Sequence, residues 1–385
     1  MISVVSTRGI GGLAQAAILV VLVRGLGPVN FGYFTLITTI VSFLAMGGGL
    51  GLTTLALRIG ALNDPEAWAR QTIRLRNLTI WVSGLVVYFI ASTFMGTTQW
   101  VIIMSLLAAI FEMTSGHLEA TLFGLKRVKA AQQSLVSRRI LVLVSFLAIL
   151  ATDVSLEIAY SCSLVLAMVA SNWWTRSIAR RGVPLKEVLT ETLPYWVPSV
   201  LTKLTTVDII VARMILPAST FGTFSAANRV VSTFQLVPAS LLSIFTPHLT
   251  TANSPRTRAK TARKLLNRMS WGALGLVAIS PALGFLISLI AGPQYSGLLP
   301  VATILIVAFA AECLSQVITA YFYAANAPKL VNQATALSLG IGLVILLALG
   351  FWWGAVGASL GVLSMRAISA ASLYRAFRVD AMRRQ

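Results

Sequence analysis

Residues 195–245 read YWVPSVLTKLTTVDIIVARMILPASTFGTFSAANRVVSTFQLVPASLLSIF, and this stretch decides the fold. Its apolar runs are long enough for two membrane-spanning helices, which we predict at 193–215 and 221–246. Charged side chains interrupt both runs: Lys203, Asp208 and Arg213 in the first, and Arg229 in the second. A charge at the bilayer centre costs roughly 2.5–3.5 kcal/mol on insertion scales, so it is retained only where it faces a partner or a polar cavity. We therefore expect this helix pair to line the path of a substrate.

The composition of the whole chain supports a membrane protein. Hydrophobic residues make up 57% of the 385 residues and charged residues only 11%, and the mean hydropathy is +0.84. A water-facing surface needs far more charge than this. The apolar runs, such as 102–110 and 341–349, are too continuous for the alternating strands of a membrane barrel. We predict an all-α polytopic membrane protein.

The breaks in hydropathy predict about twelve spans of roughly 20 residues, each long enough for a bilayer core of about 30 Å. The predicted spans are 4–24, 33–57, 77–96, 99–121, 139–153, 156–175, 193–215, 221–246, 270–291, 298–324, 331–351 and 353–374.

The net charge of +19 is typical of a protein that binds nucleic acid, but the distribution of the charge along the chain excludes that function. Most of the 30 Lys and Arg residues fall in every second connection between spans, and we count Arg76, Arg138 and Arg139 among them. This is the pattern of cytoplasmic loops, so both termini are predicted to be cytoplasmic. Contact of these loops with anionic lipid is the alternative role for the basic residues.

An internal repeat divides the predicted spans into two halves. FGYF at 31–34 recurs as FGTF at 221–224, and VS at 41–42 recurs at 231–232, with the same offset. Each FGxF opens an even-numbered span after a proline-containing outer turn. Because six spans separate the copies, the halves have the same orientation, which predicts a parallel repeat. We expect six-helix lobes at 1–186 and 187–385 around a central cavity.

Several motifs together resemble one family. They are GLGP at 25–28 with FG at 31–32; Asp208 with FG at 221–222, AA at 226–227, Arg229 and FTP at 245–247; GPQY at 292–295 with AAN at 324–326 and Lys329; and GAVGA at 354–358. In this order they resemble the Wzx-type polysaccharide (O-antigen) flippases of the MOP (multidrug/oligosaccharidyl-lipid/polysaccharide) exporter superfamily. The resemblance covers nearly the whole chain.

The resemblance implies a flippase of the bacterial plasma (inner) membrane. Its substrate would be a polyprenyl-pyrophosphate-linked oligosaccharide, moved from the cytoplasmic to the outer leaflet by alternating access. Membrane lipids and polysaccharide assembly proteins would be its partners. Two features depart from the family pattern. The chain has twelve predicted spans, against fourteen in lipid II flippases, so a peptidoglycan precursor is the less favoured cargo. The segment before the first span is short, which leads us to expect a natural start upstream of Met1.

The candidate substrate site is cationic. Lys203, Arg229, Arg213, Arg24 and Asn228 could together replace the hydration of a pyrophosphate, since fixed cations and polar groups compensate a buried anion. On a continuous helix, Lys203 and Arg213 would share one polar stripe. Arg229 would lie roughly 12 Å along its helix from the start of that span. For Arg24 and Arg213, extension of the side chain to the outer interface is the alternative.

The acidic residues within predicted spans have two interpretations. Asp208, Glu112 and Glu312 could couple transport to H⁺ or Na⁺, or each could form an internal salt bridge. For Asp208, which lies off the predicted stripe, the salt-bridge partners would be Arg229 or Arg366. We expect His117 and Glu119, near a cytoplasmic helix end, to be solvated.

No catalytic or metal-binding constellation emerges from the sequence, and we predict no cofactor. The predicted outer connections are too short to hold the catalytic groups of a membrane polysaccharide polymerase. A multidrug or other lipid antiporter of the same superfamily remains an alternative function, although it would require an acidic and aromatic pocket. A scaffold without transport activity also remains open.

Overall fold

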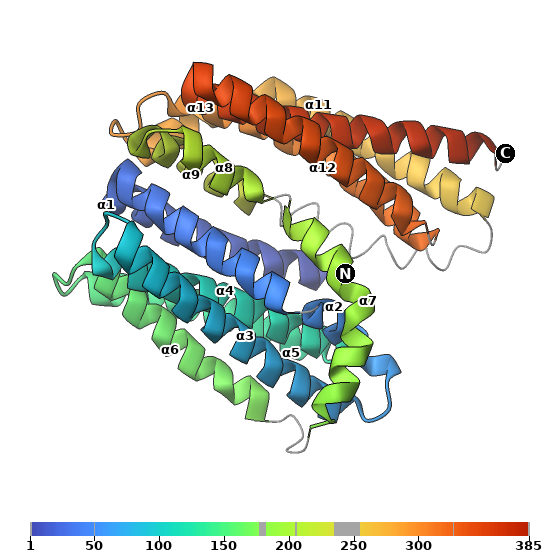
Figure 1. Cartoon of the computed structure of the whole chain (residues 1–385), viewed down its shortest axis with the longest axis horizontal. Helices are drawn as coiled ribbons and strands as arrows, with labels where there is room; N and C mark the ends of the chain where they lie inside the picture. Colours follow the sequence, from blue (N-terminus) through green and yellow to red (C-terminus); the bar gives the residue numbers. More distant parts are fainter. Residues whose placement is uncertain are drawn as a thin grey trace. The chain divides into compact units, whose positions relative to one another are not determined.

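The computed structural model describes residues 2–49, 51–176, 182–204, 206–234, 255–325 and 327–383. Its contacts form two compact units. The first unit comprises Ser6–Leu26 and Tyr33–Thr206. The second unit comprises Met1–Val5, Gly27–Gly32 and Val207–Gln385. The described segments consist of helices joined by short connections, as predicted for an all-α chain (Figure 1).

The first unit contains most of α1 and the helices up to α7. These elements are α1 (Ile2–Gly48), α2 (Leu52–Ala56), the 3₁₀ helix η1 (Ile59–Ala61), α3 (Pro65–Phe94), α4 (Gln99–Gly124), α5 (Val128–Leu150), α6 (Leu156–Arg176) and α7 (Leu185–Leu204). Helices α3 to α6 are grouped in one bundle (Figure 1). Each packs against the next in the chain, and α6 also packs against α4.

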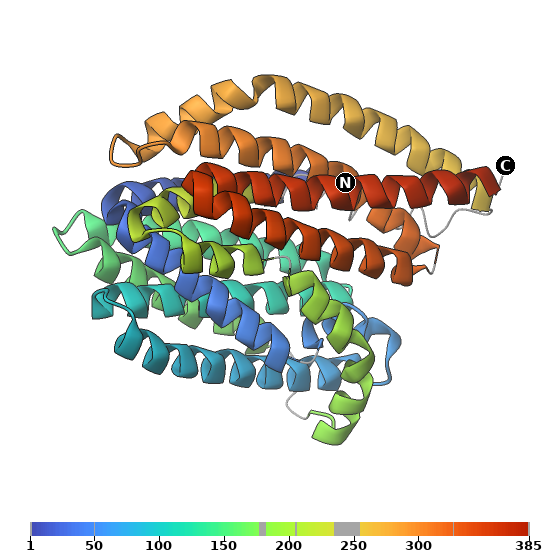
Figure 2. The ribbon, with the colours of Figure 1, turned by 45° about the horizontal axis from the view of Figure 1, so that its top comes forward.

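The second unit contains the later helices. They are α8 (Val207–Ile215), α9 (Ala218–Thr233), α11 (Pro255–Ala291), α12 (Leu298–Ala324) and α13 (Pro328–Arg383). Helix α12 is central, because it packs against α9, α11 and α13. The long helices α11, α12 and α13 lie side by side in both views (Figures 1 and 2).

Seven of the described helices are long and apolar enough to cross a membrane: α1, α3, α4, α5, α11, α12 and α13. Two of them are broken by a glycine in the left-handed region, where other residues are strained. In α1 this is Gly27, with φ of 68°, and in α13 it is Gly354, with φ of 59°. Helix α13 therefore holds two of the predicted spans, whereas α1 holds the span at 4–24 and the span at 33–57 only as far as Gly48, where the predicted end was wrong.

Several predicted helix ends were wrong. Helix α3 begins at Pro65, after an N-cap at which Asp64 accepts a hydrogen bond from the Ala67 amide at 3.3 Å, and not at residue 77. Helices α5 and α11 likewise begin well before residues 139 and 270. In each case the helix continues beyond its apolar part, which a hydropathy window does not detect. Residues 235–246 of the eighth predicted span, with FTP at 245–247, lie outside the described residues.

The predicted helix at 193–215 was also wrong, because two helices occupy it. Helix α7 ends at Leu204 and α8 begins at Val207, and the compact units divide between Thr206 and Val207. Helix α7 belongs to the first unit because it packs on α2 and α3, with Val188 buried in a cluster that includes Leu52 and Trp68. The division into six-helix lobes at 186 and 187 stays a prediction.

The two FG pairs of the repeat meet within the second unit. A Cβ atom placed on Gly32 would lie 3.0 Å from Cδ1 of Phe221 and 3.2 Å from Cα of Gly222. A Cβ atom placed on Gly222 would lie 1.8 Å from the carbonyl oxygen of Pro28. The backbones of α1 and α9 therefore approach closely at this point, and a side chain larger than hydrogen does not fit at Gly222.

The outer helices present apolar side chains to their surroundings. Trp81, Leu85 and Phe89 are exposed on α3, and Trp271 and Leu274 are exposed on α11. Large apolar side chains gathered on exposed helix faces are unfavourable in water and favourable in lipid. These faces fit a helix bundle embedded in a bilayer.

Candidate functional site

Two charges from different helices form an ion pair in the second unit. The Arg366 guanidinium on α13 lies 3.5 Å from Oε1 of Glu312 on α12 (Nη1 to Oε1). Nε2 of Gln316, one turn further along α12, donates a hydrogen bond to the same oxygen at 3.4 Å. Both charged side chains are largely shielded, with 21% exposure for Arg366 and 15% for Glu312. The pair thus lies inside the helix bundle.

Asp208 of α8 belongs to the same group of charges. Its side chain is buried, and it interacts electrostatically with Arg366 and with Glu312. The amide of Ile209 donates a hydrogen bond to its Oδ1 at 2.9 Å. We call Asp208, Glu312 and Arg366 the second-unit cluster. It combines two acidic groups with one basic group, so a proton or a cation bound there would balance its charge.

A second ion pair lies in the first unit. Arg139 of α5 binds Glu112 of α4 through two hydrogen bonds, Nη1 to Oε1 at 2.6 Å and Nη2 to Oε2 at 2.8 Å. Gln15 of α1 donates to Oε1 of Glu112 at 3.2 Å. Bidentate pairing of guanidinium with carboxylate is the strongest geometry for such a contact. We call Gln15, Glu112 and Arg139 the first-unit cluster, and its formal charges balance.

The two clusters occupy related positions in the two halves of the chain. Glu112 and Glu312 lie equally far, in residues, from the last residues of their helices, Gly124 and Ala324. Helices α4 and α12 are the fourth and tenth of the predicted spans, which correspond in a parallel repeat. The first predicted span of each half supplies the third member, Gln15 in one and Asp208 in the other. Each half therefore has a partly buried glutamate paired with an arginine, and only the second-unit cluster has a second acid.

Of the residues predicted for the anion site, Arg229 and Asn228 lie on α9 and are half-buried. The preceding residues of α9, from Phe221 to Ala227, are all buried, so Arg229 follows an enclosed part of the helix. No salt bridge found among the described residues involves Arg229. This separates Arg229 from Arg139 and Arg366, each of which faces a glutamate.

Arg213 has contacts of its own at the end of α8. Its Nη1 donates to the carbonyl oxygen of Leu216 at 3.4 Å, and its guanidinium carbon lies 6.0 Å from the ring centre of Phe221. A basic side chain that binds a carbonyl at a helix C-terminus stabilises that end. These contacts favour a structural role for Arg213.

Lys203 and Arg24 belong to the first unit. Arg24 is exposed on α1. Lys203 lies in α7, but its side chain is outside the part of the chain that the structure describes. The prediction that Lys203 and Arg213 share a polar stripe was wrong, because α7 ends at Leu204 and α8 begins at Val207, so the two residues do not lie on one helix. The four-cation cavity drawn from both units stays a prediction.

Three arginines counted as loop residues lie inside helices instead. Arg76 is buried in α3 and donates to the carbonyl oxygen of Ala45 at 2.5 Å. Arg138 is buried in α5, where its Nε donates to the carbonyl oxygen of Ser134 at 2.8 Å. Arg139 is the partner of Glu112 described above. Their assignment to a loop was wrong because both helices extend past their apolar segments.

His117 is not solvated as predicted. It is 2% exposed in α4, with its Nδ1 3.4 Å from the hydroxyl oxygen of Thr53. Glu119 is half-buried and interacts electrostatically with Arg138. No group of three or more His, Cys, Asp and Glu side chains suited to a metal ion occurs in the described ranges.

Gln15 and Arg139 are the cluster members that were not predicted as site residues from the sequence, and neither was Gln316, which donates a hydrogen bond to Glu312. Gln15 is a single polar side chain in an apolar run, which is a weak signal. Arg139 could have been found, because a glutamate in one predicted span calls for a basic partner in a neighbouring one.

Comparisons with known proteins give the fold. No protein-family model matches the chain, and no curated protein sequence matches it. Solved structures do match. The MATE transporter VcmN of Vibrio cholerae has a TM-score of 0.68 at 16% identity, covering 98% of this chain and 95% of the other. A MOP superfamily transporter from Pyrococcus furiosus, described as having a binding pocket of reversed polarity, has a TM-score of 0.67 at 16% identity, covering 99% and 95%.

The lipid II flippase MurJ, in an inward closed conformation, has a TM-score of 0.66 at 13% identity, covering 99% of this chain and 89% of the other. The chain therefore has the fold of MOP superfamily transporters, an all-α fold with multiple membrane spans. The proteins it resembles are transporters and not enzymes. At these identities the likeness is one of fold, and it leaves the specific Wzx resemblance as a prediction.

Proposed function

We propose that this protein is a transporter that moves a polyprenyl-pyrophosphate-linked oligosaccharide from the cytoplasmic to the outer leaflet of a bacterial plasma membrane. The fold supports transport, and the likeness to MurJ supports a lipid-linked substrate. The Wzx-like motifs favour a glycan repeat unit as the cargo. Alternating access by the two halves around a shared cavity is the mechanism this proposal assumes.

One observation carries the choice of an anionic substrate. Arg229 is half-buried after an enclosed run of α9, and no carboxylate pairs with it in the described part of the chain. Arg139 and Arg366, which are also partly buried, each face a glutamate, whereas the fully buried Arg76 and Arg138 donate to backbone carbonyl oxygens. A pyrophosphate would supply the missing countercharge for Arg229, with Asn228 donating a further hydrogen bond. Lys203 and Arg24 complete the proposed cation set, whereas the contacts of Arg213 at the end of α8 favour a structural role for it.

The second-unit cluster is the proposed site of ion coupling. Asp208 and Glu312 share Arg366, and binding of H⁺ or Na⁺ would remove the surplus acidic charge. The bidentate pair of Glu112 with Arg139 is already balanced, which favours a structural role for the first-unit cluster.

Flipping is tested in proteoliposomes that contain the full chain and a fluorescent polyprenyl-pyrophosphate-linked sugar. Loss of fluorescence to a membrane-impermeant quencher measures how much of the lipid reaches the outer leaflet. Arg229→Gln should slow flipping roughly 10- to 100-fold, the worth of one hydrogen bond to a charged group. Arg256→Gln is the matched control, since Arg256 is an exposed arginine on α11. If the wild-type protein moves organic cations but does not flip this lipid, drug export replaces lipid flipping as the proposed function.

Ion coupling is tested in the same vesicles with imposed H⁺ or Na⁺ gradients. Asp208→Asn should remove the dependence of the flipping rate on the coupled gradient. Glu187→Gln, at an exposed acidic residue of α7, should keep that dependence. If Asp208→Asn responds to the gradient as wild type does, the second-unit cluster is not the coupling site.

A further inference from the structure

A cavity of about 1020 Å³ opens between α11, α12 and α13 of the second unit, separate from the buried charge clusters. Four basic side chains line it: Lys260, Arg263 and Lys264 from α11, and Arg378 from α13. By the positive-inside pattern, these helix ends lie on the cytoplasmic side of the membrane. None of the residues that line this cavity belongs to the proposed transport site.

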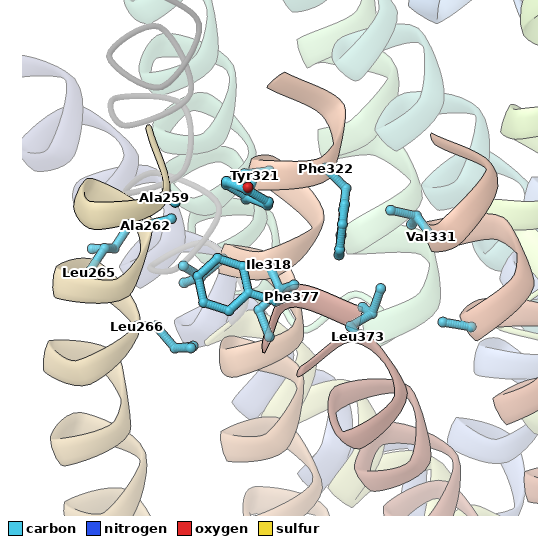
Figure 3. Close-up of a cluster of buried hydrophobic side chains, with 13 residues drawn as sticks. Ala259, Ala262, Leu265, Leu266, Ile318, Tyr321, Phe322, Val331, Leu373 and Phe377 are labelled. Atoms are coloured by element: carbon cyan, nitrogen blue, oxygen red, sulfur yellow. The ribbon is translucent and has the colours of Figure 1, made fainter. Parts of the chain in front are cut away.

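The packing of α11 fixes which of its residues face the cavity. Ala262 and Leu265 belong to a buried hydrophobic cluster with Ile318 and Tyr321 of α12 and Phe377 of α13 (Figure 3). The basic positions at 260, 263 and 264 are spaced i, i+3 and i+4 and so share one face of the helix. Because the cluster holds α11 against its neighbours, this basic face is directed into the cavity.

Among the residues that the structure describes, no acidic side chain neutralises the basic residues of the cavity. Its described lining contains no Asp or Glu. None of the salt bridges found in the described ranges involves Lys260, Arg263, Lys264 or Arg378. The acidic residue of this end of α13, Asp380, accepts a hydrogen bond from the Tyr321 hydroxyl at 2.5 Å. Four cations around one concave space favour the binding of an anion with several oxygen atoms.

The rest of the lining favours an amphiphile over a soluble anion. Leu314 and Ile318 of α12 form part of the wall, and Tyr374 of α13 is partly exposed beside it. The Arg378 guanidinium carbon lies 6.0 Å from the centre of the Tyr374 ring. Next along α11, Trp271 is exposed on the helix surface. Basic residues at the membrane boundary, directly adjoining apolar side chains, match a phosphate headgroup with its acyl chains.

We propose that this cavity binds the phosphate headgroup of an anionic lipid of the cytoplasmic leaflet. The basic side chains would contact the phosphate oxygens, and the apolar wall would contact the first part of the acyl chains. Two kinds of lipid carry such a headgroup: a bulk phospholipid such as phosphatidylglycerol, and a polyprenyl pyrophosphate. A competition experiment between them shows which one the cavity prefers.

The test measures binding of fluorescent short-chain phosphatidylglycerol to the full-length protein in uncharged detergent, with phosphatidylcholine as the neutral lipid. The triple variant Arg263→Gln, Lys264→Gln, Arg378→Gln should bind phosphatidylglycerol roughly a hundredfold more weakly, because each basic residue near an anionic lipid contributes about a factor of five. The three side chains are exposed, so the variant should melt at the wild-type temperature without lipid.

A matched triple variant is Arg256→Gln, Arg268→Gln, Arg375→Gln. It removes the same charge from exposed positions of the same two helices outside the cavity, and it should retain binding. Equal loss in both variants would mean general attraction of lipid to a basic protein, and would overturn the proposal. So would equal binding of phosphatidylcholine, or saturation of the site by inorganic phosphate alone at the same concentration as the lipid. Displacement by polyprenyl pyrophosphate at lower concentration than by phosphatidylglycerol would identify the former as the preferred lipid.

Discussion

Replacement of Gly222 by alanine should damage the fold more than replacement of any freely exposed glycine. An alanine Cβ at this position would lie 1.8 Å from the oxygen and 2.3 Å from the carbon of the Pro28 carbonyl group. An ordinary contact would need about 1.5 Å more space. Both obstructing atoms belong to the backbone, so no side-chain rotation relieves the clash.

The size of the effect follows from two opposing terms. Overpacking costs typically 1–3 kcal/mol, and a clash with backbone belongs at or above the upper end of that range. Alanine in place of glycine within a helix stabilises the folded protein by up to about 1 kcal/mol, because alanine has the higher helix propensity. We therefore expect Gly222→Ala to destabilise the protein by about 2 kcal/mol or more. Gly275→Ala of α11, where a Cβ atom meets nothing within 4 Å, should be neutral or stabilising by up to about 1 kcal/mol.

Thermal unfolding in detergent, followed by tryptophan fluorescence at one heating rate, compares the two variants. Gly32→Ala should fall between them, because its Cβ atom would lie 3.0 Å from the Phe221 ring, which can shift slightly. Equal melting temperatures for Gly222→Ala and Gly275→Ala would refute the close approach of α1 and α9 at the repeated FG pair.

Three further predictions concern single side chains. Arg139→Met should destabilise the protein by roughly 1–3 kcal/mol, since it leaves the partly buried Glu112 without its basic partner; Arg139→Met combined with Glu112→Gln should recover most of the loss in melting temperature. Tyr321→Phe should cost about 1–3 kcal/mol in thermal unfolding, because it removes the hydrogen bond to Asp380 while keeping the packing of the ring, and an unchanged melting temperature would contradict that bond. Arg213→Gln should lower flipping less than Arg229→Gln in the proteoliposome assay, since Arg213 is already engaged with the end of α8; an equal loss would return Arg213 to the substrate site.

Much of the fold was predictable because hydrophobic length and backbone freedom act locally. Apolar runs with few charges require helices in a bilayer, where backbone polar groups must be satisfied within the segment. The breaks within α1 and α13 occur at Gly27 and Gly354, inside the motifs GLGP and GAVGA. Helix ends were less predictable, as at α3 and α11, because polar helical turns outside the apolar core resemble loops in composition.

The candidate site was predictable only in part. Glu112, Glu312 and Asp208 were identified because an acidic residue in an apolar run has a high free-energy cost in a bilayer. Salt bridging was one of their two expected roles. The choice of partner was not predictable, because it depends on which helices are neighbours: Glu312 pairs with Arg366 from α13, whereas Glu112 pairs with Arg139 from α5. The prediction that Lys203 and Arg213 share a polar stripe was wrong because it assumed one continuous helix through residue 206.

The sequence by itself determined that this protein is an all-α chain with apolar helices and a repeated FG pair. These properties follow from the cost of exposing polar backbone and charges to lipid, which each segment meets separately. Only the tertiary structure decided which charges are paired, that Gly32 packs on Gly222, and that the basic face of α11 meets Arg378 of α13 around one cavity. Such contacts join residues far apart in the chain, and their geometry is set by the packing of whole helices rather than by local composition.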